Sequence, residues 1–198
     1  AHFINTVSAA FLSETAAGQH AFVEPAVRQE IAAKLQSGCA TGILNAPAPD
    51  YCPSADTSLA LRYGPQDHAL GKRGNKIVLQ GRLGLNRDGN APLLFWPSRM
   101  DPAQKGCGLL MEILYAVVSE FWDENLQVVF VADGSDQRHV RDIVDFHGLR
   151  RRVSVNDFDE PLSRLAYAAS DFLLMPSIFE PCGLPQMIGP KYGCLPIA

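Results

Sequence analysis

The sequence lacks the features that mark several large classes of protein. Its 198 residues contain no run of about 18 apolar residues, so a transmembrane helix is not expected. The first residues show no signal-peptide pattern. Positive charge is not in excess either, because 17 Lys and Arg face 21 Asp and Glu, for a net charge of −4. That balance argues against a general nucleic-acid-binding protein, and neither a membrane nor a nucleic-acid partner is expected.

The cysteines and histidines form no recognisable site. The five cysteines include no Cys-x-x-Cys pair and are odd in number, which argues against a structural zinc site or a disulfide framework. A reducing cytoplasm is therefore the expected setting. The five histidines are scattered without metal-ligand spacing, and no Walker-type phosphate loop is present. We expect neither a metal nor a separate cofactor.

The second half of the chain alternates between short apolar runs and amphipathic stretches. The overall composition is that of an ordinary globular protein, with 47% hydrophobic and 19% charged residues. The apolar runs predict strands and the stretches between them predict helices. Strands are expected at residues 93–96, 126–132, 153–155, 172–175 and 195–197, and helices at 108–121, 137–147, 162–169 and 186–192. Repeated β-α units with short connections predict an α/β fold with a doubly wound parallel sheet.

The first half of the chain has a different pattern. Residues 3–7 are strand-like, and Ser8 is placed to cap a helix that follows it. Residues 46–70 are rich in Pro, Ala, Asp and Ser, as loops are. Residues 75–83 then predict an amphipathic helix, which Gly84 is placed to end.

The loop that joins strand 172–175 to helix 186–192 is the leading candidate for a ligand site. Ligands of open α/β sheets collect where the strands end, and the free N–H groups at a helix start favour an anion. Gly183 and Leu184 would supply such N–H groups. Glu180 is unexpected beside a phosphate, because the two negative charges repel. Its carboxylate must address another part of the ligand, such as a sugar hydroxyl.

Three further loops begin at the same edge of the predicted sheet, because each follows the carboxyl end of a parallel strand. Arg99 and Lys105, six residues apart in the first of them, would offset the two negative charges of a diphosphate, unless they are simply solvated loop cations. In the second loop, Asp133 and Gly134 form either a plain turn or a contact to a ribose or base. In the third, Phe158 either stacks on a base or packs in the core.

Two motifs near the carboxy end carry a family resemblance. Residues 177–186 read Ser-x-Phe-Glu-Pro-Cys-Gly-Leu-x-Gln, and residues 191–196 read Lys-Tyr-Gly-Cys-Leu-Pro. Both closely resemble the bacterial glycogen synthase and plant starch synthase family, whose members are retaining glucosyltransferases of the two-domain GT-B fold. The resemblance implies transfer of glucose from ADP-glucose to the non-reducing end of an α-1,4-glucan. It also implies that this chain belongs to the Rossmann-like carboxy-terminal half of such an enzyme.

The same resemblance implies roles for individual residues. Glu180 would be catalytic, because it would position the donor glucose and stabilise the positive charge that develops on it. Arg99 and Lys105 match the family segment that contacts the donor diphosphate, so both would stabilise the leaving group. The donor-binding residues expected beside them are Gly134, Phe158, Leu162, Cys182, Gly183, Leu184 and Pro185.

The sequence departs from the family at several positions, which leaves two alternatives open. Ile178 replaces a frequent Arg and Pro185 a common Thr. One alternative is a degenerate, non-catalytic module that binds glucan or has a regulatory role. The other is a related retaining GT-B enzyme that uses a UDP-sugar. Many such enzymes carry a second Glu eight residues after the first, whereas this chain has Ile188 there.

The resemblance also predicts how the chain is organised. Residues 1–45 would be a remnant of the amino-terminal domain, residues 46–91 an interdomain linker and helix, and residues 92–198 a nucleotide-sugar-binding domain truncated at its carboxy end. The chain opens without Met and lacks the family's amino-terminal Lys-x-Gly-Gly-Leu motif, so we expect a piece of a longer protein. Alone, this piece would bind nucleotide weakly and transfer no glucose. Its expected partners are ADP-glucose, the glucan acceptor and the missing amino-terminal domain.

Overall fold

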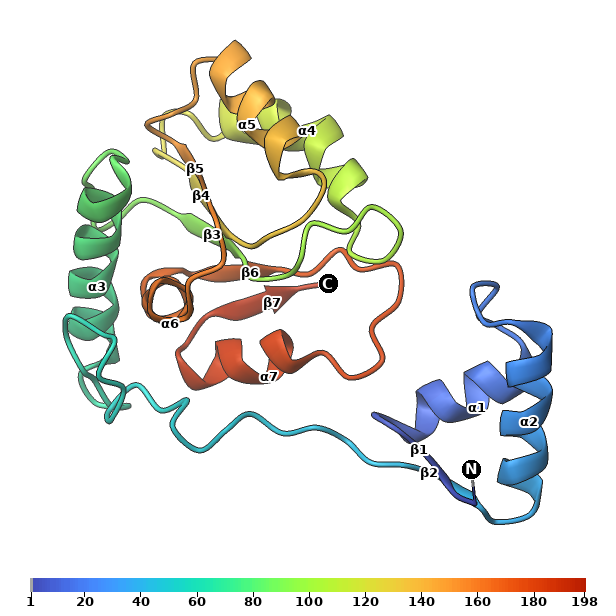
Figure 1. Cartoon of the computed structure of the whole chain (residues 1–198). Helices are drawn as coiled ribbons and strands as arrows, with labels where there is room; N and C mark the ends of the chain where they lie inside the picture. The colour runs from blue at the N-terminus through green and yellow to red at the C-terminus, as the bar shows by residue number, and fades with distance from the viewer. Residues whose placement is uncertain (1) are drawn as a thin grey trace. The chain divides into compact units, whose positions relative to one another are not determined.

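The computed structural model describes residues 2–198, which form two compact units (Figure 1). The smaller unit comprises the chain up to Pro47 together with Glu180–Leu184. The larger unit comprises Ala48–Phe179 and Pro185–Ala198. Each unit has its own secondary structure.

The larger unit is a parallel five-stranded sheet with helices on both faces. Its strands are β3 (Leu93–Trp96), β4 (Gln127–Val131), β5 (Val153–Asn156), β6 (Phe172–Leu174) and β7 (Leu195–Ile197). Its helices are α3 (His68–Leu83), α4 (Cys107–Glu120), α5 (Gln137–Phe146), α6 (Glu160–Ala169) and α7 (Leu184–Lys191). Figure 1 shows α4 and α5 over one face of the sheet and α6 and α7 over the other. The doubly wound parallel α/β fold predicted from the sequence is therefore confirmed.

Alternate side chains of the strands build the two halves of the core. Trp96 and Phe130 face α4 and α5, where they belong to one buried cluster with Leu114 and Val140. On the other face, Phe95 packs edge-on against Tyr167 of α6, with ring centroids 5.0 Å apart. Because β3 and β4 are buried on both faces, they read in the sequence as continuous apolar runs rather than as alternating patterns.

The strand order places a topological switch point at the centre of the sheet. The order is β5-β4-β3-β6-β7, so the chain starts in the middle at β3, moves outward to β5, and then crosses over to β6. Connections therefore leave β3 and β6 in opposite directions. In open α/β sheets, ligands bind in the crevice at the carboxyl ends of the strands where this reversal occurs.

Helix α3 begins earlier than the sequence predicts. It starts at His68 rather than at residue 75, and ends as predicted at Gly84, which has a left-handed conformation. The extra turns contain Gly71, which weakens helix propensity, but Gly71 is buried and a Cβ there would lie 2.3 Å from Tyr63 Cβ. Close packing against the preceding segment therefore stabilises turns that the local sequence does not favour.

The segment before α3 groups with the larger unit. Arg164 of α6 forms ion pairs with Asp50 at 2.7 Å and with buried Asp56 at 3.4 Å. The Tyr63 hydroxyl donates to the Tyr192 carbonyl at 2.9 Å, between helix α7 and strand β7. Residues 48–91 therefore contribute to the packing of the sheet domain.

The smaller unit contains a short parallel pair of strands and two helices. Strand β1 (Ile4–Thr6) pairs with β2 (Ala40–Gly42), and the helices are α1 (Ala9–Ala17) and α2 (Pro25–Gln36). The Ser8 hydroxyl accepts the Phe11 N–H at 2.9 Å, as expected for a helix cap. Helix α2, which has no buried residue, was not predicted from the sequence. In the described part of the chain, no helix is long and apolar enough to cross a membrane.

Candidate functional site

The two loops at the switch point are packed against each other. The loop after β3 covers residues 97–106, and the connection after β6 begins at Met175. The Ile178 N–H donates to the Gln104 carbonyl at 2.8 Å. Gly106 has a φ of +71°, and a Cβ at this residue would lie 2.0 Å from the Pro176 carbonyl oxygen. Glycine is therefore required where α4 begins, because any side chain would separate the two loops.

Arg99 is held outward by buried neighbours on both sides. Ser98 and Met100 have exposed fractions of 7% and 1%, whereas Arg99 is exposed. The Trp96 indole N–H donates to the Ser98 carbonyl at 2.5 Å, and the Met100 N–H donates to the Asp133 carbonyl at 2.9 Å. The buried residues Ser98 and Met100 thus fix the backbone on both sides of Arg99, while its guanidinium stays available to a ligand.

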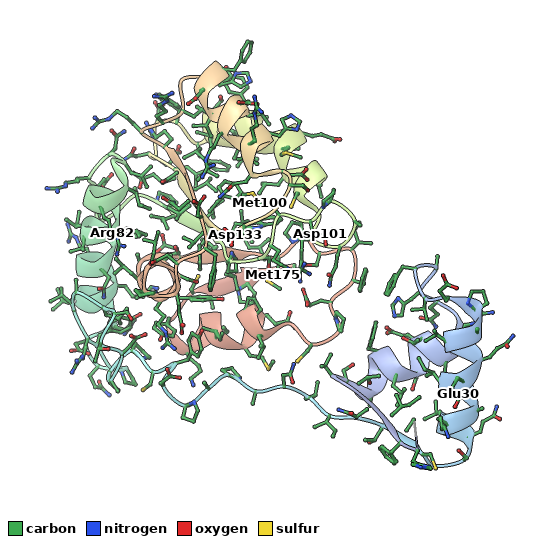
Figure 2. The ribbon with its side chains drawn as sticks, in the orientation of Figure 1. Glu30, Arg82, Met100, Asp101, Asp133 and Met175 are labelled. Atoms are coloured by element: carbon green, nitrogen blue, oxygen red, sulfur yellow. The ribbon has the colours of Figure 1, made fainter. Side chains whose placement is uncertain are left out.

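Gly134 is the contact point between the loops that follow β3 and β4. It forms a parallel bridge with Met100, and its φ is +150°. A Cβ at position 134 would lie 2.3 Å from the Met100 carbonyl oxygen. The glycine thus allows the two backbones to approach more closely than any side chain would permit. Figure 2 shows Met100, Asp133 and Met175 gathered on the side of the sheet where the strands end.

Two adjoining hollows open beside these loops. The first, of about 370 Å³, is lined by Arg99, Met100, Asp101, Pro102, Asp133, Gly134 and Ser135. The second, of about 320 Å³, is lined by Pro97, Arg99, Ala132, Asp133 and Phe158. Arg99 and Asp133 line both hollows, and the Phe158 ring is 58% exposed. The fold therefore brings together Arg99, Gly134 and Phe158, three of the residues proposed from the sequence.

Lys105 lies in the same loop as Arg99, and Asp101 organises the turn between them. The Asp101 carbonyl accepts the Lys105 N–H at 2.9 Å, and Asp101 Oδ1 accepts the Ala103 N–H at 2.9 Å. The Lys105 side chain is half-buried. The loop is thus hydrogen-bonded within itself. Arg99 lines both hollows, whereas Lys105 lines neither.

Leu162 is buried in helix α6. Only 5% of its surface is exposed, and its N–H donates to the Asp159 side chain, which caps the helix, at 2.7 Å. Its side chain therefore supports the helix that follows Phe158. Leu162 does not line either hollow.

The remaining predicted residues lie between β6 and the first turn of α7. Glu180 and Cys182 are half-buried in this connection. Gly183 is buried and has a left-handed φ of +75°, which glycine adopts without strain. Leu184 and Pro185 are the first two residues of α7. Proline suits such a position because an N–H in the first turn has no partner inside the helix.

Asp133 has a structural role that the sequence pattern does not indicate. Its carbonyl binds the loop after β3 through Met100, and its Oδ1 accepts the Phe158 N–H from the loop after β5 at 2.9 Å. One aspartate thus ties together three loops at the edge of the sheet. The sequence predicted either a plain turn or a contact to a ribose or base at this position. It did not indicate the two loop contacts, because Met100 lies 33 residues before Asp133 and Phe158 lies 25 residues after it. Within residues 2–198, no three His, Cys, Asp or Glu side chains are grouped as metal ligands.

Sequence comparison finds relatives over most of the chain. The family model described as "Glycosyl transferases group 1" matches residues 91–195, more than half of the chain. Starch synthase 3 of Arabidopsis thaliana is 38% identical over 164 residues, which cover 79% of this chain and 15% of the relative. A glycogen synthase of Streptococcus agalactiae is 34% identical over 168 residues, which cover 83% of this chain and 34% of the relative. The chain thus spans only about a third or less of these relatives.

Structure comparison gives a close match over the whole chain. The catalytic domain of starch synthase IV from Arabidopsis thaliana, solved with ADP and acarbose, superimposes with a TM-score of 0.83 at 30% identity. The match covers 100% of this chain and 39% of that domain. The family model and the structural match both include the loops that carry Arg99, Asp133, Phe158 and Glu180.

Proposed function

Because the chain belongs to the group 1 glycosyl transferases, we propose that it is the nucleotide-sugar-binding part of a glycogen or starch synthase. The homology to both kinds of synthase confirms the resemblance found in the sequence, and the fold is that of a GT-B glycosyltransferase. The proposed reaction moves glucose from ADP-glucose to the non-reducing end of an α-1,4-glucan with retention of configuration. The observation that carries the proposal is the pair of hollows where Arg99, Asp133 and Phe158 meet, in a chain whose structural neighbour was solved with ADP.

The proposed donor site uses the two ends of a nucleoside diphosphate differently. The Phe158 ring, exposed at the second hollow, stacks on the base. Arg99 binds the diphosphate, since its planar guanidinium donates paired hydrogen bonds to phosphate oxygens. As expected from the sequence, we further propose that the backbone N–H groups of Gly183 and of the first turn of α7 add donors for the anion.

The proposed chemistry rests on charge stabilisation. As the bond between glucose C1 and the diphosphate breaks, negative charge grows on the leaving ADP and positive charge grows on the sugar. Arg99 and Lys105 offset the first of these charges. Glu180 positions the glucose and offsets the second. Cys182, Leu184 and Pro185 then serve as walls of the donor pocket, and Leu162 supports it from within α6.

Glucose transfer requires more than this chain. The chain spans 15% and 34% of the two relatives described above, and the acceptor glucan is proposed to bind with the help of the remaining protein. We therefore expect nucleotide binding but no transfer by these 198 residues alone. Measurable glucose transfer by the isolated chain would contradict this division of roles.

Calorimetric titration of the chain with ADP, and separately with UDP, tests the donor assignment. ADP is expected to bind more tightly than UDP, and Arg99→Ala and Lys105→Ala are each expected to weaken ADP binding by about tenfold or more. Arg138→Ala removes an exposed cation of α5 that lines neither hollow, and should leave ADP binding unchanged.

The alternatives predict different outcomes of the same titration. Tighter binding of UDP than of ADP would identify a related enzyme with a UDP-sugar donor. Absence of binding by either nucleotide would overturn the proposed donor site and favour a non-catalytic glucan-binding or regulatory module. In that case Ile178→Arg and Pro185→Thr, which restore common family residues, would show whether those two departures disabled the site.

A further inference from the structure

Asp133 occupies the position between the two ends of the proposed donor site. It lines the first hollow together with Arg99, and it lines the second together with Arg99 and Phe158. A nucleoside diphosphate has its ribose between base and phosphates. If the base lies on Phe158 and the phosphates lie on Arg99, the ribose passes over the one carboxylate that lines both hollows.

The Asp133 carboxylate is fixed but only partly used by the protein. Its Oδ1 accepts the Phe158 N–H at 2.9 Å, and the backbone carbonyl of Asp133 accepts the Met100 N–H at 2.9 Å. Within residues 2–198, Oδ2 accepts no hydrogen bond, and the residue as a whole is exposed. The side chain is therefore held in place by one oxygen while the other remains available at the hollow.

The charge of Asp133 restricts what it can bind. A carboxylate only accepts hydrogen bonds, and it repels phosphate, so it is unsuited to the diphosphate. The 2′- and 3′-hydroxyls of ribose are neutral donors, and hydrogen bonds to an ionised acceptor are stronger than those between neutral groups. A ribose diol is therefore the part of the nucleotide that matches this carboxylate.

We infer that Asp133 binds the ribose hydroxyls of the donor and selects ribonucleotides over deoxyribonucleotides. The inference rests on the proposed function, because it takes a nucleoside diphosphate as the ligand. It adds a specificity-determining residue that does not take part in bond breaking. It also explains why a carboxylate lies in a cleft that must accept a diphosphate.

The test compares ADP with 2′-deoxyADP and 3′-deoxyADP by calorimetric titration. The wild-type chain is expected to bind ADP about ten- to a hundredfold more tightly than at least one of the deoxy analogues. In Asp133→Ala this ratio should fall to near one, even if the affinity for every nucleotide declines. The ratio within each variant is informative because a general distortion of the loop would weaken all three ligands alike.

Two further variants keep the result interpretable. Asp133→Asn preserves the size of the side chain and an oxygen that can accept the Phe158 N–H. If Asp133→Ala does not fold, the ratio of the affinities for ADP and its deoxy analogues can be measured in Asp133→Asn instead. Asp157→Asn changes a neighbouring carboxylate that pairs with Arg141 at 2.8 Å and lines neither hollow, and should keep the wild-type ratio.

The outcomes separate this inference from the proposed function. Equal wild-type affinity for ADP and both analogues, or an unchanged ratio in the Asp133 variants, would overturn the role of Asp133 while leaving ADP binding intact. Failure of the wild-type chain to bind ADP would overturn the donor site and this inference together.

Discussion

The Lys76 ammonium lies 2.6 Å from Asp171 Oδ2, in a pair that joins helix α3 to the start of the switch-point strands. Lys76 is only 4% exposed and also donates to the Ala91 carbonyl at 2.8 Å. Asp171 Oδ2 accepts the Leu93 N–H at 2.9 Å as well. One ion pair therefore anchors the beginnings of β3 and β6, whose carboxyl ends carry the candidate site.

Loss of this pair is expected to destabilise the fold. Lys76→Met removes the cation but keeps much of the apolar stem. It leaves the partly buried Asp171 carboxylate without its cation and the Ala91 carbonyl without its side-chain donor. We expect the free energy of unfolding to fall by about 2–4 kcal/mol, measured by chemical denaturation. Arg150→Met breaks an exposed pair with Asp145 of similar length, 2.6 Å, and should have little effect. Similar losses in both variants would contradict the importance of burial.

The contact between Gly134 and Met100 is expected to tolerate no side chain. Gly134→Ala places a Cβ 2.3 Å from the Met100 carbonyl oxygen, so the loops after β3 and β4 must separate. We expect a loss of about 1–3 kcal/mol of stability together with weaker ADP binding. Gly108→Ala, in the first turn of α4, meets nothing within 4 Å and should be neutral or stabilising. Unchanged stability of Gly134→Ala would show that the loops have more room than this geometry indicates.

Stability is expected to fall on the alkaline side because of a buried thiol. Burial, with a smaller effect of Asp136, raises the pKa of Cys107 from 9.0 to about 11. Between pH 9 and pH 11 the unfolded chain has released this proton while the folded chain retains it. The contribution of Cys107 to the free energy of unfolding is therefore fully present below pH 9. It is lost as the pH rises from 9 towards 11, by at most about 1.4 kcal/mol per pH unit.

Urea denaturation between pH 7 and pH 10.5 measures this contribution. Cys107→Ala should be less stable at pH 7, because it leaves a small cavity in the core, but its stability should decline less steeply above pH 9. Cys39→Ala changes a thiol outside the core and serves as the control. An equally steep alkaline decline in Cys107→Ala and in the wild-type chain would exclude Cys107 as a source.

Glu180 is expected to affect turnover and not nucleotide affinity. In the full-length protein, Glu180→Gln keeps the size of the side chain but removes the charge proposed to face the donor sugar. We expect turnover to fall by about a hundredfold or more, while the affinity for ADP, which has no glucose, changes little. Glu112→Gln alters an exposed carboxylate of α4 and should retain activity. A parallel loss of ADP binding in Glu180→Gln would instead assign Glu180 to the nucleotide.

Local sequence patterns determined most of the elements of this protein. Short, mainly apolar runs predicted all five strands of the larger unit. The pattern is strongest in β3 and β4, because strands buried on both faces need apolar residues at nearly every position. Ser8 and Gly84 marked helix ends correctly, since capping depends on one side chain or one backbone conformation. The motif around Glu180 indicated the family. Because Arg99, Gly134 and Phe158 each follow a predicted strand, the sequence also predicted that they lie at one edge of the sheet.

The tertiary structure decided what depends on residues distant in the sequence. The sequence predicted the start of α3 too late, because the first turns of the helix depend on packing of Gly71 against Tyr63. A tertiary contact of this kind leaves no trace in the periodicity of the helix itself. Burial of Leu162 inside α6 is likewise a property of the packed sheet. The strand order that sets the switch point, and the link from Met100 through Asp133 to Phe158, join separate loops by backbone contacts. Sequence patterns indicate where strands and helices form and end, whereas only the folded chain determines which loops meet.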